Sequence, residues 1–266
     1  MSRYADMFRR LGNQGAFGGF LMLGDPSLEA SGAMLDALVD GGADMIEVGI
    51  PFSDPIADGP TIQAAADRAL AAGATPAACF RILADFRARH PDIPVGVLTY
   101  ANLVLARGRD AFYRACAEAG VDSVLVADAP VMEAAPFAEA ARAHGVDPVL
   151  IAAPNTPTET LKRLARISGG YTYCVARAGV TGVETEMQLD HSALLGQLRE
   201  FGAPPPVLGF GISRPEHVRA ALNAGAAGVI SGSAIVKLIE GEADVAQAVR
   251  AFVFTMKAAT AVTDGP

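Results

Sequence analysis

Residues 45–61 read MIEVGIPFSDPIADGPT. The first four residues are an apolar run that predicts a short buried strand, with Glu47 as its one charged side chain. Because side chains alternate along a strand, Ile46 and Val48 should point away from the side that carries Glu47. A carboxylate on a buried strand is costly unless it is paired or functional, so we expect its pKa to be raised.

The rest of this stretch predicts a loop. Three prolines and Gly59 interrupt the backbone, and Asp54 and Asp58 lie among them. One acid on a rigid strand and others on a loop that could fold over it suit general acid–base chemistry on a small molecule. A structural interpretation stays open: a salt-bridged buried glutamate, followed by ordinary Asp-Pro and Asp-Gly turns.

Outward from this stretch, short apolar runs alternate with longer amphipathic segments along the whole chain. The apolar runs predict eight strands, at 16–23, 45–48, 95–98, 123–126, 149–151, 171–175, 207–210 and 228–231. The amphipathic segments predict helices at 27–40, 60–72, 75–90, 109–119, 132–144, 158–167, 192–201 and 214–224, and further helices from 234 and from 243 to about 261.

Eight strand–helix units in about 250 residues are typical of a (β/α)8 barrel. The alternative, an open doubly wound sheet, usually carries a glycine-rich turn after its first strand. Here Gly15, Gly18 and Gly19 lie before or within that strand instead. We therefore predict an α/β fold: a single TIM-barrel domain over residues 1–266, with extra N-terminal and loop helices.

Composition excludes several classes of function. The chain has 266 residues, of which 51% are hydrophobic, and its net charge is −8 without any basic run, which argues against nucleic acid or an anionic membrane as partner. No apolar run reaches membrane-spanning length, and residues 1–12 do not resemble a signal peptide. The three cysteines are odd in number and lack pair spacing, so we expect a reducing, cytoplasmic location. The four histidines are far apart, and we predict no metal site.

In a barrel of this kind the active site gathers at the C-terminal ends of the strands. Two glycine-rich turns close the predicted barrel there, at 209–213 and 231–234, each before a helix. Their backbone N–H groups and the positive end of the helix dipole can bind an anion, and Ser233 adds a hydroxyl. Gly182, after the sixth strand, could supply further amides. Glycines that only tighten turns are the alternative, but their occurrence in both loops favours a phosphate site at Gly211, Gly232 and Ser233.

These motifs resemble one family, the alpha subunit of tryptophan synthase. The resemblance covers essentially the whole chain in order, and its most specific part is the run EVGIPFSDPIADGPTIQ at 47–63. It also includes LGDP at 23–26, YAN at 100–102, YTY at 171–173, RAGVTG at 177–182, GFGIS at 209–213 and GVISGSAI at 228–235.

The resemblance implies a retro-aldol cleavage of indole-3-glycerol phosphate to indole and glyceraldehyde 3-phosphate. Glu47 would donate and accept protons, Asp58 would stabilise the cationic ring, and Tyr173 would assist at the substrate hydroxyls. An apolar pocket for the ring would be walled by Phe20, Leu98, Tyr100, Leu125, Ile151 and Phe210. For Leu125 and Ile151, an ordinary place in the barrel core is an alternative.

The resemblance also implies a partner. Indole would pass to a pyridoxal-phosphate-dependent beta subunit in an α2β2 assembly, and this chain itself would hold no cofactor. Loops 51–60 and 177–190 would form a lid in which Asp54 meets Thr181. Gly18-Gly19 departs from the family pattern, and we expect it to loosen the first strand. A free-standing indole-glycerol-phosphate lyase and a non-catalytic activating subunit are the alternative functions.

Overall fold

The computed structural model describes residues 2–175, 191–209, 211–241 and 244–261. Eight parallel strands pair in chain order, and β1 pairs with both β2 and β8, so the sheet closes into a barrel. The strands are β1 (Ala16–Met22), β2 (Met45–Gly49), β3 (Val95–Thr99), β4 (Ser123–Val126), β5 (Asp147–Ala152), β6 (Thr172–Cys174), β7 (Pro206–Gly209) and β8 (Gly228–Ser231). The predicted (β/α)8 fold is confirmed.

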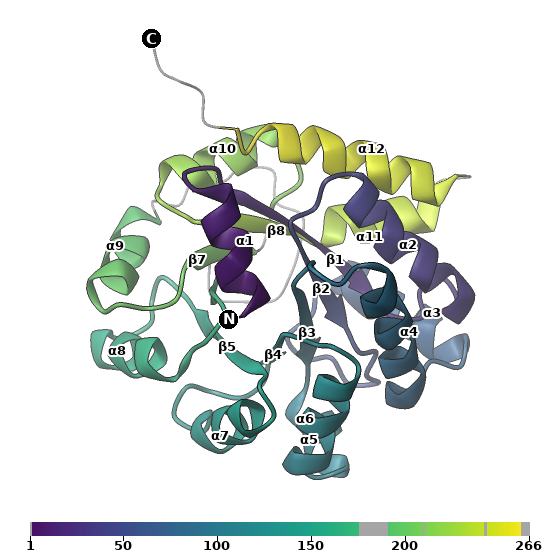
Figure 1. The fold of residues 1–266 in the computed structure, drawn as a ribbon, viewed down its shortest axis with the longest axis horizontal. Helices are drawn as coiled ribbons and strands as arrows, with labels where there is room; N and C mark the ends of the chain where they lie inside the picture. Colours follow the sequence, from purple (N-terminus) through teal and green to yellow (C-terminus); the bar gives the residue numbers. More distant parts are fainter. Residues whose placement is uncertain (1, 176–190, 210, 242–243, 262–266) are drawn as a thin grey trace.

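Helices surround the barrel (Figure 1). Within the described residues they are α1 (Arg3–Leu11), α2 (Leu28–Asp40), α3 (Pro60–Ala71), α4 (Pro76–Arg89), α5 (Ala101–Ala106), α6 (Arg109–Glu118), α7 (Ala135–Ala143), α8 (Thr158–Ile167), α9 (Ser192–Glu200), α10 (Pro215–Asn223), α11 (Ser233–Gly241) and α12 (Val245–Ala258). No single helix among them is long and apolar enough to cross a membrane, and α3 and α4 reach that length and character only together, across a 98° bend.

The N-terminal helix α1 lies across one end of the barrel (Figure 1). The hydroxyl of Tyr4 is 2.8 Å from Oγ of Ser123, the first residue of β4. Arg3 Nη1 is 2.7 Å from Oδ1 of the neighbouring Asp122. These contacts place α1 at the N-terminal ends of the strands, so α1 does not cover the opposite end.

Some element bounds differ from the prediction for local reasons. Helix α7 begins at Ala135 rather than at 132, because Pro136 fits the first helical turn, where its missing N–H is not needed. Strand β6 is only three residues long, shorter than its apolar run. The short helix α5 was not predicted and follows β3 directly, with Tyr100 as its N-cap residue.

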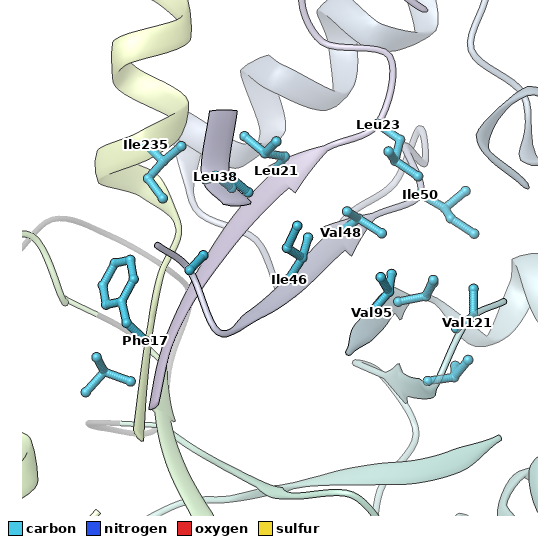
Figure 2. Close-up of a cluster of buried hydrophobic side chains, with 14 of the residues drawn as sticks. Phe17, Leu21, Leu23, Leu38, Ile46, Val48, Ile50, Val95, Val121 and Ile235 are labelled. Carbon is cyan, nitrogen blue, oxygen red and sulfur yellow. The ribbon is translucent and has the colours of Figure 1, made fainter. Parts of the chain in front are cut away.

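The strands separate two sets of buried side chains. Ile46 and Val48 lie in the layer between the barrel and its helices, together with Phe17, Leu21 and other residues drawn in Figure 2. Phe20 belongs instead to the cluster that fills the barrel interior. The predicted alternation along β2 is therefore confirmed, and Glu47 lies on the inner side.

Gly18 and Gly19 do not loosen β1, contrary to the expectation. Both pair with β2 and with β8, and all seven residues of the strand are buried. Neighbouring side chains occupy the space that a Cβ atom would fill: Ile230 at 2.9 Å from the Gly18 position and Leu38 at 2.7 Å from the Gly19 position. The two glycines therefore allow close packing on both sides of the strand.

Candidate active site

Glu47 lies at the centre of the site. It pairs in register with Phe20 of β1 and Gly96 of β3, and only 1% of it is exposed. Burial raises its pKa from the ordinary value of 4.5 to about 7. The hydroxyl of Tyr171 donates a hydrogen bond to Glu47 Oε1 at 2.8 Å, which lowers that pKa, while the charge of Asp58 raises it. The fold thus holds a carboxyl group that can both give and take a proton near neutral pH.

Asp58 lies on the loop between β2 and α3. The loop ends where Pro60 begins α3, and the Asp58 N–H donates to the Pro55 carbonyl at 3.0 Å. Only 5% of Asp58 is exposed, and burial raises its pKa from the ordinary value of 3.8 to about 6. The hydroxyl of Tyr100 donates to Asp58 Oδ2 at 2.8 Å and lowers that pKa. Of the two buried acids, Asp58 is the one that ionises first as pH rises.

Glu47 and Asp58 line one cavity at the C-terminal end of the barrel, of about 550 Å³ counting its open mouth. Apolar side chains from four elements and a turn form its walls: Phe20, Ile62, Leu98, Ile212 and Ile230. A flat apolar ring fits a cavity with such walls, and the two acids are among the polar groups that line it. The prediction had named Phe20 and Leu98. The three isoleucines were not predicted. They come from α3, from the turn after β7 and from β8, and only the closed barrel brings these three segments to one cavity.

The glycine-rich turns lie at the same cavity. Gly211 and Ser213 line it after β7, and Gly232, Ser233 and Ala234 line it after β8. Helix α11 begins at Ser233, and the N–H groups of Ile235 and Val236 donate to the Gly232 carbonyl at 2.9 and 3.1 Å. The backbone N–H groups that come before these helical hydrogen bonds belong to Gly232, Ser233 and Ala234, the three residues of this turn that line the cavity. A Cβ atom at Gly232 would lie 3.6 Å from Phe20, so packing does not require glycine there.

In the turn after β7, one backbone N–H group that was expected to bind an anion already has a partner within the protein. The Ser213 N–H donates to Nδ1 of His217 at 3.3 Å. His217 is on α10 and only 5% of it is exposed; its Nε2 lies 3.0 Å from Nη2 of Arg214. A histidine side chain therefore holds the backbone of this turn in place, and the glycine pattern did not indicate this contact.

The other predicted residues fall in three groups. Tyr173 lines the cavity, and its hydroxyl lies 2.1 Å from where a Cβ atom of Gly209 would stand. Tyr100, Leu125 and Ile151 do not line it: Leu125 is in the barrel interior, and Ile151 borders a neighbouring cavity. Their assignment to a ring pocket stays a prediction. Asp54 is exposed, while Gly182, Thr181 and Phe210 lie outside the described residues.

Tyr171 is the main polar contact that the sequence analysis missed. It is the residue two positions before Tyr173, so both side chains point into the barrel, and Tyr171 lies deeper. The repeated tyrosine at alternate positions was a usable signal. What it could not show was which of the two hydroxyls meets Glu47.

Comparison with known proteins agrees with this geometry. The family model described as "Tryptophan synthase alpha chain" matches residues 8–262. A tryptophan synthase alpha chain of Aeromonas hydrophila is 56% identical over 266 residues, which is 98% of this chain and 99% of that protein. The solved Mycobacterium tuberculosis tryptophan synthase matches with a TM-score of 0.88 and 32% identity, covering 98% of this chain and 99% of that one. The tryptophan synthase a2b2 complex of Pyrococcus furiosus matches with a TM-score of 0.82 and 37% identity, covering 91% and 98%. The chain therefore belongs to the tryptophan synthase alpha chain family.

Proposed function

We propose that this chain cleaves indole-3-glycerol phosphate into indole and glyceraldehyde 3-phosphate. One observation carries the proposal: Glu47 and Asp58 line the same cavity as the glycine-rich turns at 211–213 and 232–234. A substrate with a flat ring, a short hydroxylated chain and a phosphate needs an apolar slot, two acids and an anion site in that arrangement.

The pKa order of the two acids supports their roles. With the pKa of Glu47 at about 7 and that of Asp58 at about 6, Glu47 is protonated and Asp58 ionised between these values. Two carboxyl groups whose surroundings separate their pKa values can act as an acid and as a fixed anion in one site.

The chemical steps of the reaction use Glu47 and Asp58. Glu47 donates its proton to carbon 3 of the indole ring, which places a positive charge on the ring, and the ionised Asp58 stabilises the ring N–H. The carboxylate of Glu47 then takes the proton of the neighbouring side-chain hydroxyl. The bond between carbon 3 and the side chain breaks, its electron pair neutralises the ring to give indole, and the hydroxyl carbon becomes the aldehyde. Glu47 is left protonated, so the cycle closes.

The two ends of the substrate have separate binding groups. The amides of 232–234, at the start of α11, would hold the phosphate, with the Ser233 hydroxyl beside them. Gly211 would contribute from the turn after β7, and Gly182 from its own loop. Tyr173 would lie near the substrate hydroxyls, because it lines the cavity, interacts electrostatically with both acids and has its hydroxyl beside Gly209, at the start of the turn after β7.

We further propose that the chain delivers indole to a beta subunit that carries pyridoxal phosphate, in an α2β2 assembly in the cytoplasm. The Pyrococcus furiosus relative is described as an a2b2 complex. Three exposed apolar side chains, Ile56, Leu105 and Met132, follow β2, β3 and β4, at the end of the barrel where the cavity opens. All three cysteines are free and buried, which suits a reducing compartment.

The test is to mix the pure protein with indole-3-glycerol phosphate, with and without a beta subunit, and to measure indole. We expect indole in both cases and faster release with the partner. Glu47→Gln keeps the side-chain shape but removes the proton, and should lower the rate by about 10²- to 10⁴-fold. Full activity without any gain from the partner would favour the free-standing lyase. Unchanged cleavage in Glu47→Gln would refute the assigned roles, and activation of the partner without cleavage would favour a non-catalytic subunit.

A further inference from the structure

Tyr100 occupies an unusual place for a residue next to the cavity. It is 2% exposed and lies between β3 and α5, and it does not line the cavity. Its backbone is fixed, because the N–H of Ala101 donates to Oδ1 of Asp128 at 2.7 Å, just beyond the end of β4. The tyrosine is therefore anchored on the barrel rather than on the loop that it touches.

The side chain of Tyr100 contacts the loop between β2 and α3 at three points. Its hydroxyl donates to Asp58 Oδ2 at 2.8 Å and accepts from the Ala57 N–H at 3.2 Å. Its ring lies 5.3 Å from the ring of Phe52, at the other end of the loop. One side chain thus connects both ends of the loop to the barrel wall.

Asp58 has few other groups to stabilise its charge. No lysine, arginine or histidine of the described part of the chain forms an ion pair with it. The titratable groups that face it across the cavity are Glu47 and Tyr173, neither of which is a cation. A buried carboxylate without a cation depends on its hydrogen-bond donors.

We propose that Tyr100 is a positioning residue, whose hydroxyl holds Asp58 in place at the cavity and keeps it ionised, leaving Oδ1 for the ring N–H of the substrate. This inference rests on the proposed function, because Tyr100 acts only through Asp58. It gives Tyr100 a role different from that of a wall of the ring pocket.

The sign of the effect follows from the hydrogen bond. The Tyr100 hydroxyl lowers the pKa of Asp58 against the effect of burial, so its removal raises that pKa. Asp128 faces Tyr100 itself and stays in place in a phenylalanine variant. Because Asp58 must be ionised, the acid limb of the kcat/KM profile should move to higher pH in Tyr100→Phe, by about one to two pH units for a hydrogen bond to a charged group.

The experiment measures kcat/KM for indole-3-glycerol phosphate between pH 5 and pH 9 in the full chain, for the wild type, Tyr100→Phe and Tyr113→Phe. Tyr113 is a buried tyrosine of α6, in the layer between the barrel and its helices, and serves as the control. The substrate phosphate titrates near pH 6 in every case, so only a difference between variants counts. We expect a displaced acid limb in Tyr100→Phe alone.

A double-mutant cycle with Asp58→Asn separates positioning from a general packing defect. If Tyr100 acts through Asp58, its hydroxyl should matter little once the carboxylate is gone, so the two losses should not multiply. An unmoved acid limb in Tyr100→Phe, or equal rate losses in both backgrounds, would overturn the inference while leaving the proposed function intact. A wild-type chain that releases no indole would overturn the proposed function first.

Discussion

Replacing Glu47 by glutamine should stabilise the protein by an amount that depends on pH. Glu47 is 1% exposed and its pKa is raised from 4.5 to about 7, chiefly by burial. The folded chain therefore binds this proton more tightly than the unfolded chain does. The corresponding stability is fully present below pH 4.5 and is lost as pH rises through about 7. Glutamine carries no charge, so the variant escapes this loss.

The size of the effect follows from the same values. The difference between 4.5 and about 7, at about 1.4 kcal/mol for each pKa unit, comes to about 3 kcal/mol above pH 7. Glutamine can still accept the Tyr171 hydrogen bond through its amide oxygen. Its NH2 group brings two donors where the protonated carboxyl has one, and this cost does not change with pH, so the pH dependence of the gain is unaffected. For a chain of this length, about 3 kcal/mol corresponds to a rise in Tm of roughly 6 to 12 °C.

The assay is urea and thermal unfolding of the ligand-free wild type and Glu47→Gln at pH 5, 6, 7 and 8. The two should be close at pH 5, and the variant should be the more stable at pH 8. Glu118→Gln, at an exposed glutamate of α6, is the matched control and should follow the wild type at every pH. A stability difference that does not change with pH would show that burial does not raise the pKa of Glu47 in the folded chain. The proposed proton transfer near neutral pH would then lose its basis.

Three further outcomes are expected. Tyr171→Phe removes the hydrogen bond that lowers the pKa of Glu47, so the alkaline limb of kcat/KM should move upward by about one pH unit; an unmoved limb would separate Tyr171 from the chemistry. Asp58→Asn should reduce indole release by about 10²- to 10³-fold, because a neutral amide stabilises the ring cation poorly; a loss confined to KM would contradict this. Gly209→Ala should reduce cleavage more than Tyr173→Phe does, since its Cβ atom would lie 2.1 Å from the Tyr173 hydroxyl and push the ring into the cavity; activity assays on both variants decide.

Local patterns in the sequence were sufficient for the order of the eight strands and of the longer helices between them, but not for the short helix α5. Apolar runs and helix periods depend on residues close together in the chain, and the helix starts at Pro60 and Pro76 follow from the fixed φ angle of proline. The inward direction of Glu47 was predictable for the same reason, because alternation along one strand is a local property. The approach of the loop to that strand was also foreseeable, since only a few residues separate Glu47 from Asp58.

Contacts between distant residues were not predictable in this way. Tyr171 meets Glu47 across 124 positions of the chain, and Tyr100 meets Asp58 across 42. Which tyrosine reaches which acid depends on how far each strand is displaced along its neighbour when the barrel closes, and no single segment encodes that displacement.

For this protein, then, the sequence by itself determined the eight strand–helix units, the strand that bears Glu47 and the two glycine-rich turns after β7 and β8. Only the tertiary structure decided which apolar residues wall the cavity, that the Ser213 N–H donates to His217, and that the Tyr100 hydroxyl donates to Asp58. The physical reason is the range of the interactions: backbone geometry and side-chain alternation act over a few residues, whereas hydrogen bonds and burial depend on the positions that barrel closure gives to residues far apart in the chain.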